Sequence, residues 1–263
     1  MLTVPPLVVK IGGALVGDPG SLEAFWDGVV ALRTRAPVVV VHGGGPQATA
    51  LARRLGHEPR MVHGRRVTTD LDLSIIQWAL CGELNTQLVA RAQQHGLRAV
   101  GVNGASAGLV RVEKRPPWVV DGETVDFGWV GDVKGVEGRA LEALLSAGLV
   151  PVVAPLGIDG VGQVYNVNAD TVARSIAEAL GAAELLLVTE AGHVRRDPES
   201  PESYLPTCDA ALFAQGKQEG WIQGGMRVKL QVAFEALSSG VAQVHILAPD
   251  DLQHRTKSTR VVN

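Results

Sequence analysis

Residues 7–13 have the sequence LVVKIGG, a short apolar run that ends in one lysine and two glycines. Such a run, bounded by glycines, indicates a buried β-strand that opens into a turn. Lys10 lies at the exit of this strand. Because a buried ammonium group without a partner costs several kcal/mol, we expect an anionic ligand or a carboxylate beside it.

Residues 38–46, VVVVHGGGP, repeat this pattern with four valines and three consecutive glycines. Glycine turns at strand ends can present backbone N–H groups to phosphate or carboxylate oxygens. Neither turn matches the common phosphate-loop or dinucleotide-binding motifs, so ordinary strand-to-helix turns remain an alternative. His42 has no nucleophile partner or metal-ligand spacing around it, and we expect it to pack or to donate a hydrogen bond.

The composition is that of a compact globular protein. The 263 residues are 46% hydrophobic, 19% charged and only 4% aromatic, which favours parallel strands covered by helices. The formal net charge of −3 gives no indication of a nucleic acid or of an anionic membrane surface as a partner. We therefore expect small-molecule ligands.

The two cysteines and the first residues of the chain indicate the cellular compartment. Cys81 and Cys208 form no C-x-x-C pair, which argues against a disulfide framework or a zinc site and favours a reducing environment. The first residues have no signal-peptide pattern, and no apolar run of about 18 residues is present. We expect a cytoplasmic protein with no membrane span and no metal site of its own.

Strands and helices alternate along the chain. Residues 71–96 predict a long helical region that is interrupted near Gly82. Residues 109–134 predict an insertion rich in hairpins, with an Asp-Gly turn at residues 121–122. The strand–helix rhythm restarts near Leu180, which is the best candidate for a boundary between two lobes.

Residues 165–170, YNVNAD, combine two amides and one carboxylate just before a predicted helix. Asn166 and Asn168 alternate in an extended segment and therefore face the same side. Asp170 falls at the helix start, where it is a candidate for a catalytic or binding role. The alternative is that Asn168 or Asp170 only caps the helix, as both residue types do well.

Residues 220–230, GWIQGGMRVKL, predict a flexible loop at Gly224 and Gly225, followed by a helix that begins around Met226. Lys229 would then lie three residues inside the helix, within reach of a ligand at its N-terminus. The alternative for Lys229 is an exposed surface lysine.

Arg65 and Arg66 lie in an irregular, charge-rich segment, HGRRVTTD. A guanidinium group in this segment could clamp a carboxylate through two hydrogen bonds. The alternative is a solvated loop charge.

Taken together, these motifs resemble those of the amino acid kinase family. The matching segments occur in the family's order along almost the whole chain: KIGG, VVHGGGP, GRRVT, VGVNGASAG, VGDVKGV, VPVVAPLG, YNVNADTVA, LLLVTEAG, IQGGMRVK and STRVV. The resemblance implies a three-layer α/β/α sandwich with an open, mainly parallel sheet of about eight strands. It also implies that residues 1–179 form a lobe for acceptor binding and dimerisation, and that residues 180–263 form a lobe for ATP.

The implied activity is transfer of the γ-phosphoryl group of ATP to the side-chain carboxylate of N-acetylglutamate, an early step of arginine synthesis. Mg²⁺ would be bound through the nucleotide phosphates. By position in the matching motifs, Lys10 and Lys229 would flank the transferred phosphoryl group, and Asp170 would orient both ammonium groups.

The resemblance also implies two sets of binding residues. Arg66 would hold the α-carboxylate of the acceptor, and Asn166 its other polar groups. The expected acceptor-binding residues are Gly43, Gly44, Gly45, Arg66 and Asn166. The expected ATP-binding residues are Lys10, Gly12, Gly13, Thr189, Glu190, Gly225, Met226 and Lys229.

Two other functions remain open on the sequence. One is a kinase for N-acyl-α-aminoadipate, possibly linked to an acidic carrier protein, which would favour a basic rim at Arg53, Arg54, Arg65 and Arg66. The other is a non-catalytic sensor of an amino acid or a nucleotide. Only a few residues precede the first strand, whereas arginine-inhibited members carry an extra N-terminal helix that links dimers into hexamers. We therefore expect a homodimer without strong arginine inhibition.

Overall fold

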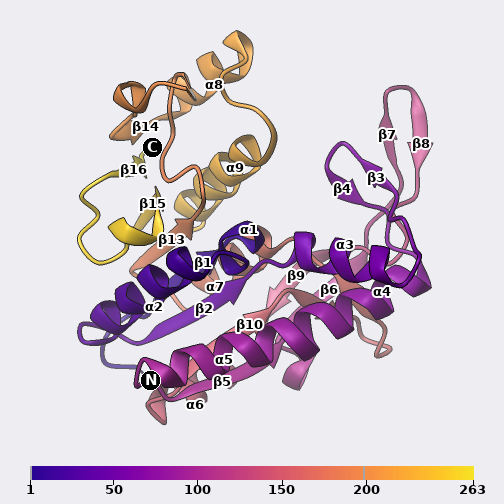
Figure 1. Ribbon diagram of the computed structural model, residues 1–263, viewed down its shortest axis with the longest axis horizontal. Coiled ribbons are helices and arrows are strands. Elements are labelled where there is room, and N and C mark those ends of the chain that lie inside the picture. The colour runs from indigo at the N-terminus through magenta and orange to yellow at the C-terminus, as the bar shows by residue number, and fades with distance from the viewer. Residues whose placement is uncertain (1, 198) are drawn as a thin grey trace.

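The computed structural model describes residues 2–197 and 199–263, and its centre is one eight-stranded sheet (Figure 1). The strands follow the order β14-β16-β15-β13-β1-β2-β10-β5, and each pair is parallel except β15–β16. Their bounds are β1 Leu7–Ile11, β2 Val38–His42, β5 Ala99–Asn103, β10 Val150–Ala154, β13 Glu184–Val188, β14 Thr207–Cys208, β15 Gln243–Leu247 and β16 Ser258–Val261. The predicted fold class is confirmed.

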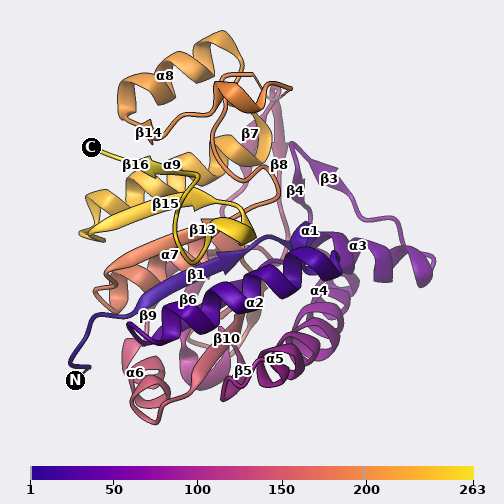
Figure 2. The ribbon, with the colours of Figure 1, turned by 60° about the vertical axis from the view of Figure 1, so that its left-hand side comes forward.

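Helices cover both faces of the sheet. Alternate residues of each strand point to opposite faces, so the apolar strands place side chains under both layers of helices. On one face, Val9 packs with apolar residues of α2 and α5; on the other, Val8 packs with residues of α6, α7 and α9. Figure 2 shows α2 and α5 in front of the sheet. The helices are α1 Gly13–Val16, α2 Pro19–Arg33, α3 Gly45–Arg54, α4 Asp70–Ile76, α5 Asn85–Gln94, α6 Gly138–Ser146, α7 Ala169–Ala179, α8 Ala210–Glu219 and α9 Gly224–Ser238. The result is a three-layer sandwich.

Strand β1 joins the two halves of the chain. It pairs in register with β2 on one side and with β13 on the other, so that Lys10 lies beside Val41 and Leu187. The residues before and after position 180 therefore share one sheet and one continuous core. Ligands of open α/β sheets bind beyond the carboxyl ends of the strands where the strand order reverses, which is the exit of β1.

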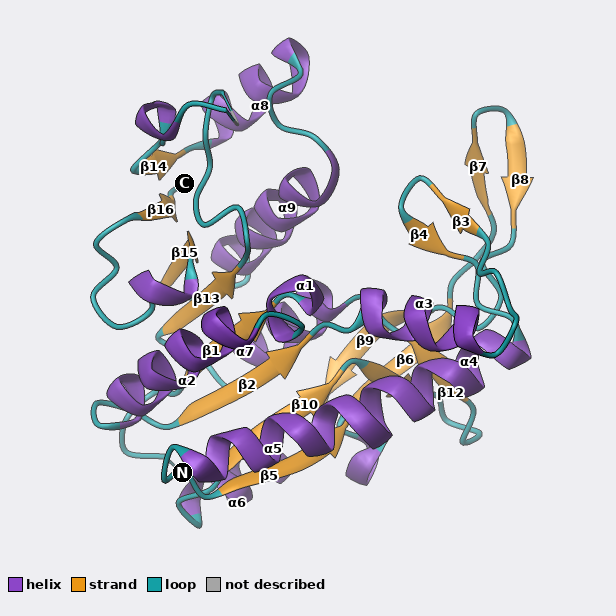
Figure 3. Ribbon diagram, viewed as in Figure 1, coloured by secondary structure: helices purple, strands orange, loops and turns teal. Residues whose placement is uncertain are grey.

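Smaller β-elements lie beside the main sheet. A four-stranded sheet has the order β12-β11-β6-β9, and two hairpins, β3–β4 and β7–β8, project from the same end of the molecule (Figure 3). Asp121 (φ 51°) and Gly122 (φ 84°) form the tip of β7–β8, which confirms the predicted Asp-Gly turn. The bounds are β3 Met61–Val62, β4 Arg65–Arg66, β6 Val110–Lys114, β7 Trp118–Val120, β8 Glu123–Val125, β9 Gly131–Val136, β11 Leu156–Ile158 and β12 Val164–Asn166.

The predicted interruption near Gly82 is present as a change of helix type, because a π-helical segment separates two α-helices there, and not as a break in the helical path. Helix α4 continues through a π-helical segment, Gln77–Leu84, directly into α5. Asn85 follows this segment and is buried, and its side-chain amide donates to the carbonyl of Val152 and to Nε2 of His42. The continuous helix therefore places a polar side chain under the end of β2. Four 3₁₀ or π segments complete the described structure: Gln77–Leu84, Ser106–Gly108, Pro201–Ser203 and Pro249–Asp251.

Gly104 lies where the loop after β5 passes against β11. A Cβ atom at this position would overlap the carbonyl oxygen of Leu156, whereas a Cβ atom on Gly82 would meet open space. We expect Gly104→Ala to lower the free energy of unfolding by about 2–3 kcal/mol, because the backbone must shift. Gly82→Ala should leave it unchanged or raise it by up to about 1 kcal/mol. Urea unfolding measures both variants, and equal stabilities would contradict this packing.

Candidate active site

An acid held between two lysines forms the centre of the site. Lys10 comes from β1, Asp170 from the first turn of α7, and Lys229 from α9. Lys10 Nζ lies 2.9 Å from Asp170 Oδ1, and Lys229 Nζ lies 3.4 Å from Asp170 Oδ2. The side chains of these three residues are 6%, 7% and 13% exposed, in the order Lys10, Asp170, Lys229. The three residues are therefore brought together, and the surface-lysine alternative for Lys229 is wrong.

In this cluster, burial and the attraction between opposite charges shift the pKa values of the side chains in opposite directions. Burial raises the pKa of Asp170, but Lys10 and Lys229 outweigh it, and the pKa lies below its ordinary value of 3.8. For Lys10, burial and the neighbouring Lys229 lower the pKa more strongly than Asp170 raises it. One carboxylate thus faces two ammonium groups, and an additional anion would be favoured beside them.

The two glycine turns pack directly against each other at the exits of β1 and β2. A Cβ atom on Gly13 would come within 2.9 Å of the Gly44 nitrogen, and one on Gly43 would come within 2.9 Å of the Gly13 nitrogen. A Cβ atom on Gly44 would meet the side chain of Leu80 at 2.7 Å. The close approach of the turns therefore requires glycine at these three positions. Because side chains are absent, backbone N–H groups can approach a ligand.

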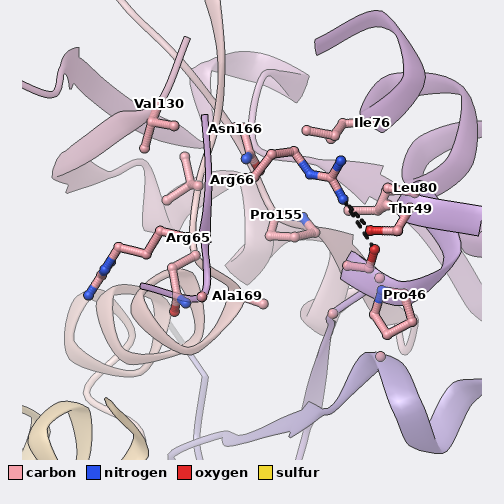
Figure 4. Close-up of a pocket in the computed structure, with 18 of the residues that line it drawn as sticks. Pro46, Thr49, Arg65, Arg66, Ile76, Leu80, Val130, Pro155, Asn166 and Ala169 are labelled. Atoms are coloured by element: carbon pink, nitrogen blue, oxygen red, sulfur yellow. Dashed lines mark hydrogen bonds between the residues drawn. The ribbon is translucent and has the colours of Figure 1, made fainter. Parts of the chain in front are cut away.

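A cavity of about 690 Å³ is lined by Lys10 and Asp170 and by residues of both glycine turns. Figure 4 shows part of its lining, including Arg66 and Asn166. All five residues that the sequence predicts for acceptor binding line it. The predicted site residues that line it are Lys10, Gly13, Gly43, Gly44, Gly45, Arg66, Asn166 and Asp170. Its volume and its mixture of apolar and cationic lining suit a small anionic molecule.

Arg66 reaches across the cavity from β4 (Figure 4). Its Nη2 donates to Thr49 Oγ1 at 2.6 Å and to the carbonyl of Gly45 at 3.4 Å. Its Nη1 lies 3.6 Å from the buried carboxylate of Asp72 and is itself buried without a hydrogen-bond partner among the described residues. A buried donor of this kind can donate to a ligand oxygen at no further cost of burial.

Asn166 and Asn168 both line the cavity, but they differ in role. Asn166 donates from Nδ2 to Thr68 Oγ1 at 3.2 Å. Asn168 caps helix α7, because its Oδ1 accepts from the backbone N–H of Thr171. The capping alternative therefore holds for Asn168, and this leaves Asp170, in the first turn of the helix, free to pair with the lysines.

The remaining predicted residues lie outside the described cavity. Helix α9 begins at Gly224 rather than around Met226, so Lys229 lies deeper in the helix than the sequence predicts. Glu190 is exposed after β13, and the N–H of Thr189 donates to the Leu247 carbonyl. The residues that do not line the cavity are Gly12, Thr189, Glu190, Gly225, Met226 and Lys229.

Three lining residues have no individual signal in the sequence analysis. Arg115 is buried against Asp132. The Nε and Nη2 atoms of Arg115 both donate to Asp132 Oδ1, at 2.9 Å and 2.6 Å. Thr49 and Leu80 line the cavity from α3 and from the π-helical segment. The charged segment EKR that contains Arg115 resembles a solvated strand end, and the long-range pairing with Asp132 is visible only after folding.

His42 is a buried structural residue. Its Nδ1 lies 2.8 Å from the Gly43 carbonyl, and its Nε2 lies 3.1 Å from Asn85 Nδ2. Because the amide of Asn85 donates to Nε2, Nδ1 carries the proton and donates to the carbonyl. Burial lowers the pKa of His42 to about 4, so the ring is neutral near pH 7. This agrees with its expected role in packing and hydrogen bonding.

The donor set of the site suits anions rather than a bound metal ion. Asp170 is the carboxylate at the cluster, and both of its oxygens face lysines. In residues 2–197 and 199–263, no group of three or more His, Cys, Asp or Glu side chains is placed to hold a metal ion. Within the same ranges, no helix has the length and apolar character needed to cross a bilayer. The arrangement can hold an anionic group beside Lys10 and a carboxylate at Arg66.

Comparisons with known proteins show a relationship along most of the chain. The amino acid kinase family model matches residues 5–248. An acetylglutamate kinase from Sorangium cellulosum is 44% identical over 253 residues, which cover 94% of this chain and 89% of the relative. One from Methanopyrus kandleri is 41% identical over 239 residues, which cover 91% of this chain and 93% of the relative.

Two solved structures share the fold. The protein smu.665 from Streptococcus mutans has a TM-score of 0.82 at 24% identity and covers 98% of both chains. Carbamate kinase from Giardia lamblia bound to AMP-PNP has a TM-score of 0.69 at 14% identity and covers 100% of both chains. Since the family model spans most of the sequence and the relatives match nearly end to end, the chain belongs to the amino acid kinase family.

Proposed function

We propose that this protein transfers the γ-phosphoryl group of ATP to the side-chain carboxylate of N-acetyl-L-glutamate, giving N-acetyl-L-glutamyl 5-phosphate for arginine synthesis. The observation that carries the proposal is the Lys10–Asp170–Lys229 cluster beside a cavity that also contains Arg66. Acetylglutamate kinases that are 41–44% identical over more than nine-tenths of this chain support the choice of acceptor.

The two alternatives have less support. An N-acyl-α-aminoadipate acceptor differs by one methylene, and the named relatives are acetylglutamate kinases. A non-catalytic sensor does not need two lysines held on one buried acid, since that arrangement is costly to bury and contributes little to simple binding.

The reaction needs positioning and charge neutralisation more than proton transfer. The acceptor carboxylate is already a nucleophile, so no general base is required, in keeping with the neutral, buried His42. The enzyme must hold two mutually repelling anions in line. Lys10 and Lys229 would stabilise the charge on the transferred phosphoryl group, and Asp170 would keep both ammonium groups aimed at it.

The acceptor would lie along the cavity between the cluster and β4. Its side-chain carboxylate would meet the backbone of Gly43, Gly44 and Gly45 near Lys10. Its α-carboxylate would accept hydrogen bonds from Arg66, whose buried Nη1 has no hydrogen-bond partner among the described residues. Asn166 would contact the remaining polar groups of the acceptor.

The nucleotide would occupy the half of the molecule that includes β13 and α9. We assign residues 1–179 to the acceptor lobe and residues 180–263 to the ATP lobe. The proposed ATP contacts are Lys10, Gly12, Gly13, Thr189, Glu190, Gly225, Met226 and Lys229. When bound with the nucleotide, Mg²⁺ would neutralise phosphate charge, and the phosphate oxygens would be its ligands.

We further propose a cytoplasmic homodimer. Leu71 and Trp78 are 46% and 55% exposed and lie seven residues apart on the continuous helix, so they share one face. Exposed large apolar residues gathered on one face are typical of a protein–protein interface. Cys81 and Cys208 are both free thiols, which suits a reducing compartment.

Removing either lysine should affect turnover more than ATP binding. We expect Lys10→Ala and Lys229→Ala to lower kcat by about 10²-fold or more with a smaller change in the KM for ATP, because their charge acts mainly in the transition state. Exposed Lys217 on α8 provides the control, and Lys217→Ala should retain full turnover. A hydroxamate assay for the acyl phosphate measures all three. Near-normal turnover in either site variant would remove that lysine from the mechanism.

Asp170→Asn should destabilise the protein in a pH-dependent way. The folded-state pKa of Asp170 is depressed, so its stabilisation is fully present above the ordinary value of 3.8 and is lost as the pH falls through the folded value. We expect a deficit of about 3–5 kcal/mol near pH 7, because two buried ammonium groups lose their partner. The deficit should shrink below about pH 4. Urea unfolding across pH 3–7 measures it, and a constant deficit would contradict the ion-pair assignment.

Arg66→Lys should selectively weaken acceptor binding. Lysine keeps the charge but cannot reproduce the planar fork that reaches Thr49 and a carboxylate together. We expect the KM for N-acetylglutamate to rise about 10-fold or more, with the KM for ATP little changed. Steady-state kinetics with each substrate varied in turn provide the test. Equal increases in both constants would place Arg66 outside the acceptor site.

A further inference from the structure

The β3–β4 hairpin, which carries Arg66, has little structural support of its own. Strand β4 consists of Arg65 and Arg66, and among the residues that the structure describes it forms a two-stranded sheet with Met61 and Val62 of β3. The hairpin instead shares a small apolar cluster with the β7–β8 hairpin and the segment after it. The members of this cluster are Val62, Val67, Trp118, Val120, Val125, Phe127 and Val130. The backbone position of Arg66 therefore depends partly on the neighbouring hairpin, while its guanidinium group also contacts Thr49, the Gly45 carbonyl and Asp72.

Trp118 is the centre of the contact between the two hairpins. The Cζ atom of Arg65 lies 4.9 Å from the centroid of the Trp118 ring, and that of Arg115 lies 4.5 Å from it. Phe127 packs edge-on against the same ring at 5.5 Å. One indole ring thus contacts two guanidinium groups, and both contacts have the geometry of a cation–π interaction.

The two arginines are held differently. Arg115 is fixed by Asp132. The Arg65 side chain has no hydrogen bond or ion pair among the described residues, and burial together with the nearby Arg115 lowers its pKa more than Asp132 raises it. Its ordered position therefore depends on Trp118, whose ring offsets part of the repulsion between the two cations.

Fixing Arg65 also fixes Arg66. Adjacent residues of a strand point to opposite faces, so an Arg65 side chain held on Trp118 directs Arg66 toward Thr49 and the Gly45 carbonyl. At the tips of the hairpins, His63 Nε2 lies 2.6 Å from Asp121 Oδ2, but both side chains are more than half exposed. An exposed pair of this kind adds little. Backbone hydrogen bonds of Thr68 with Phe127 and Trp129 hold the chain just after Arg66, and the Trp118 contacts are the side-chain connection at Arg65 itself.

We propose that Arg65, Trp118 and Arg115 form a clamp that positions Arg66 for the acceptor before the acceptor binds. Arg65 and Arg115 also line the cavity, but the role proposed for all three residues is to position Arg66 and not to take part in the reaction. Without the clamp, acceptor binding must also order the β3–β4 hairpin, and this cost falls on the acceptor and not on the nucleotide. The identity of the acceptor rests on the proposed function, whereas the clamp itself does not.

Kinetics of clamp variants test the positioning role. Trp118→Leu retains an apolar side chain but removes the aromatic ring, and Arg65→Gln removes one cation from a partly exposed site. We expect both to raise the KM for N-acetylglutamate by about 10-fold, with the KM for ATP and kcat changed less than about threefold. Arg65→Lys should restore part of the loss, because lysine also makes cation–π contacts. Val119→Ala is the matched control, since Val119 lies on the same strand and is 75% exposed.

Amide hydrogen exchange tests the clamp independently of the reaction. In Trp118→Leu, backbone amides of residues 61–67 should exchange about 10-fold faster than in the wild type, while those of α7 stay unchanged. Unchanged exchange in residues 61–67 overturns the clamp whatever the substrate is. Faster exchange with an unaltered acceptor KM, or with both KM values raised equally, overturns the positioning role. A wild-type enzyme that does not phosphorylate N-acetylglutamate overturns the proposed function, and the exchange result still decides the clamp.

Discussion

The carboxylate of Asp170 between the buried ammonium group of Lys10 and the largely buried one of Lys229 is the interaction on which the site depends. It joins β1, α7 and α9, which come from distant parts of the chain. Two lysines could not remain charged and buried side by side without it, because burial and mutual repulsion both favour loss of a proton. The same acid keeps both cations in place without fully neutralising them. One negative charge facing two positive charges leaves the cluster ready for an anionic group.

The surroundings of this cluster depend on the close packing of the two glycine turns. Gly13 and Gly43 each lie so close to the backbone of the other turn that a Cβ atom would not fit without a shift. Their contact brings the exits of β1 and β2 together at the switch point of the sheet. The end of β2 is further supported by the buried pair of His42 and Asn85. Close backbone packing, rather than side-chain chemistry, therefore shapes the floor of the cavity.

Charge is strongly segregated in this protein. Its formal net charge is −3, yet the described residues that line the cavity include five cationic side chains and one carboxylate. These are Lys10, Arg53, Arg65, Arg66, Arg115 and Asp170. A cavity lined by one sign of charge concentrates field lines and attracts anions. This suits an acceptor with two carboxylates, and it explains why the positive side chains need fixed partners such as Asp72, Asp132 and the Trp118 ring.

The sequence by itself determined the buried strands and the glycine turns, because each is a local pattern of residue types. The choice of Lys10, Asp170 and Lys229 as one set came from the resemblance of their motifs to the amino acid kinase family, since the local patterns left a helix cap and a surface lysine open. Tertiary structure alone decided that Lys229 is buried, that Asn168 is the cap while Asp170 pairs with lysines, and that the helix at Gly82 continues as a π-helical segment. It also decided the partners of Arg65 and Arg115, since Trp118 and Asp132 reach them only through the pairing of hairpins. Contacts between residues far apart in the chain depend on packing geometry, which local patterns do not encode.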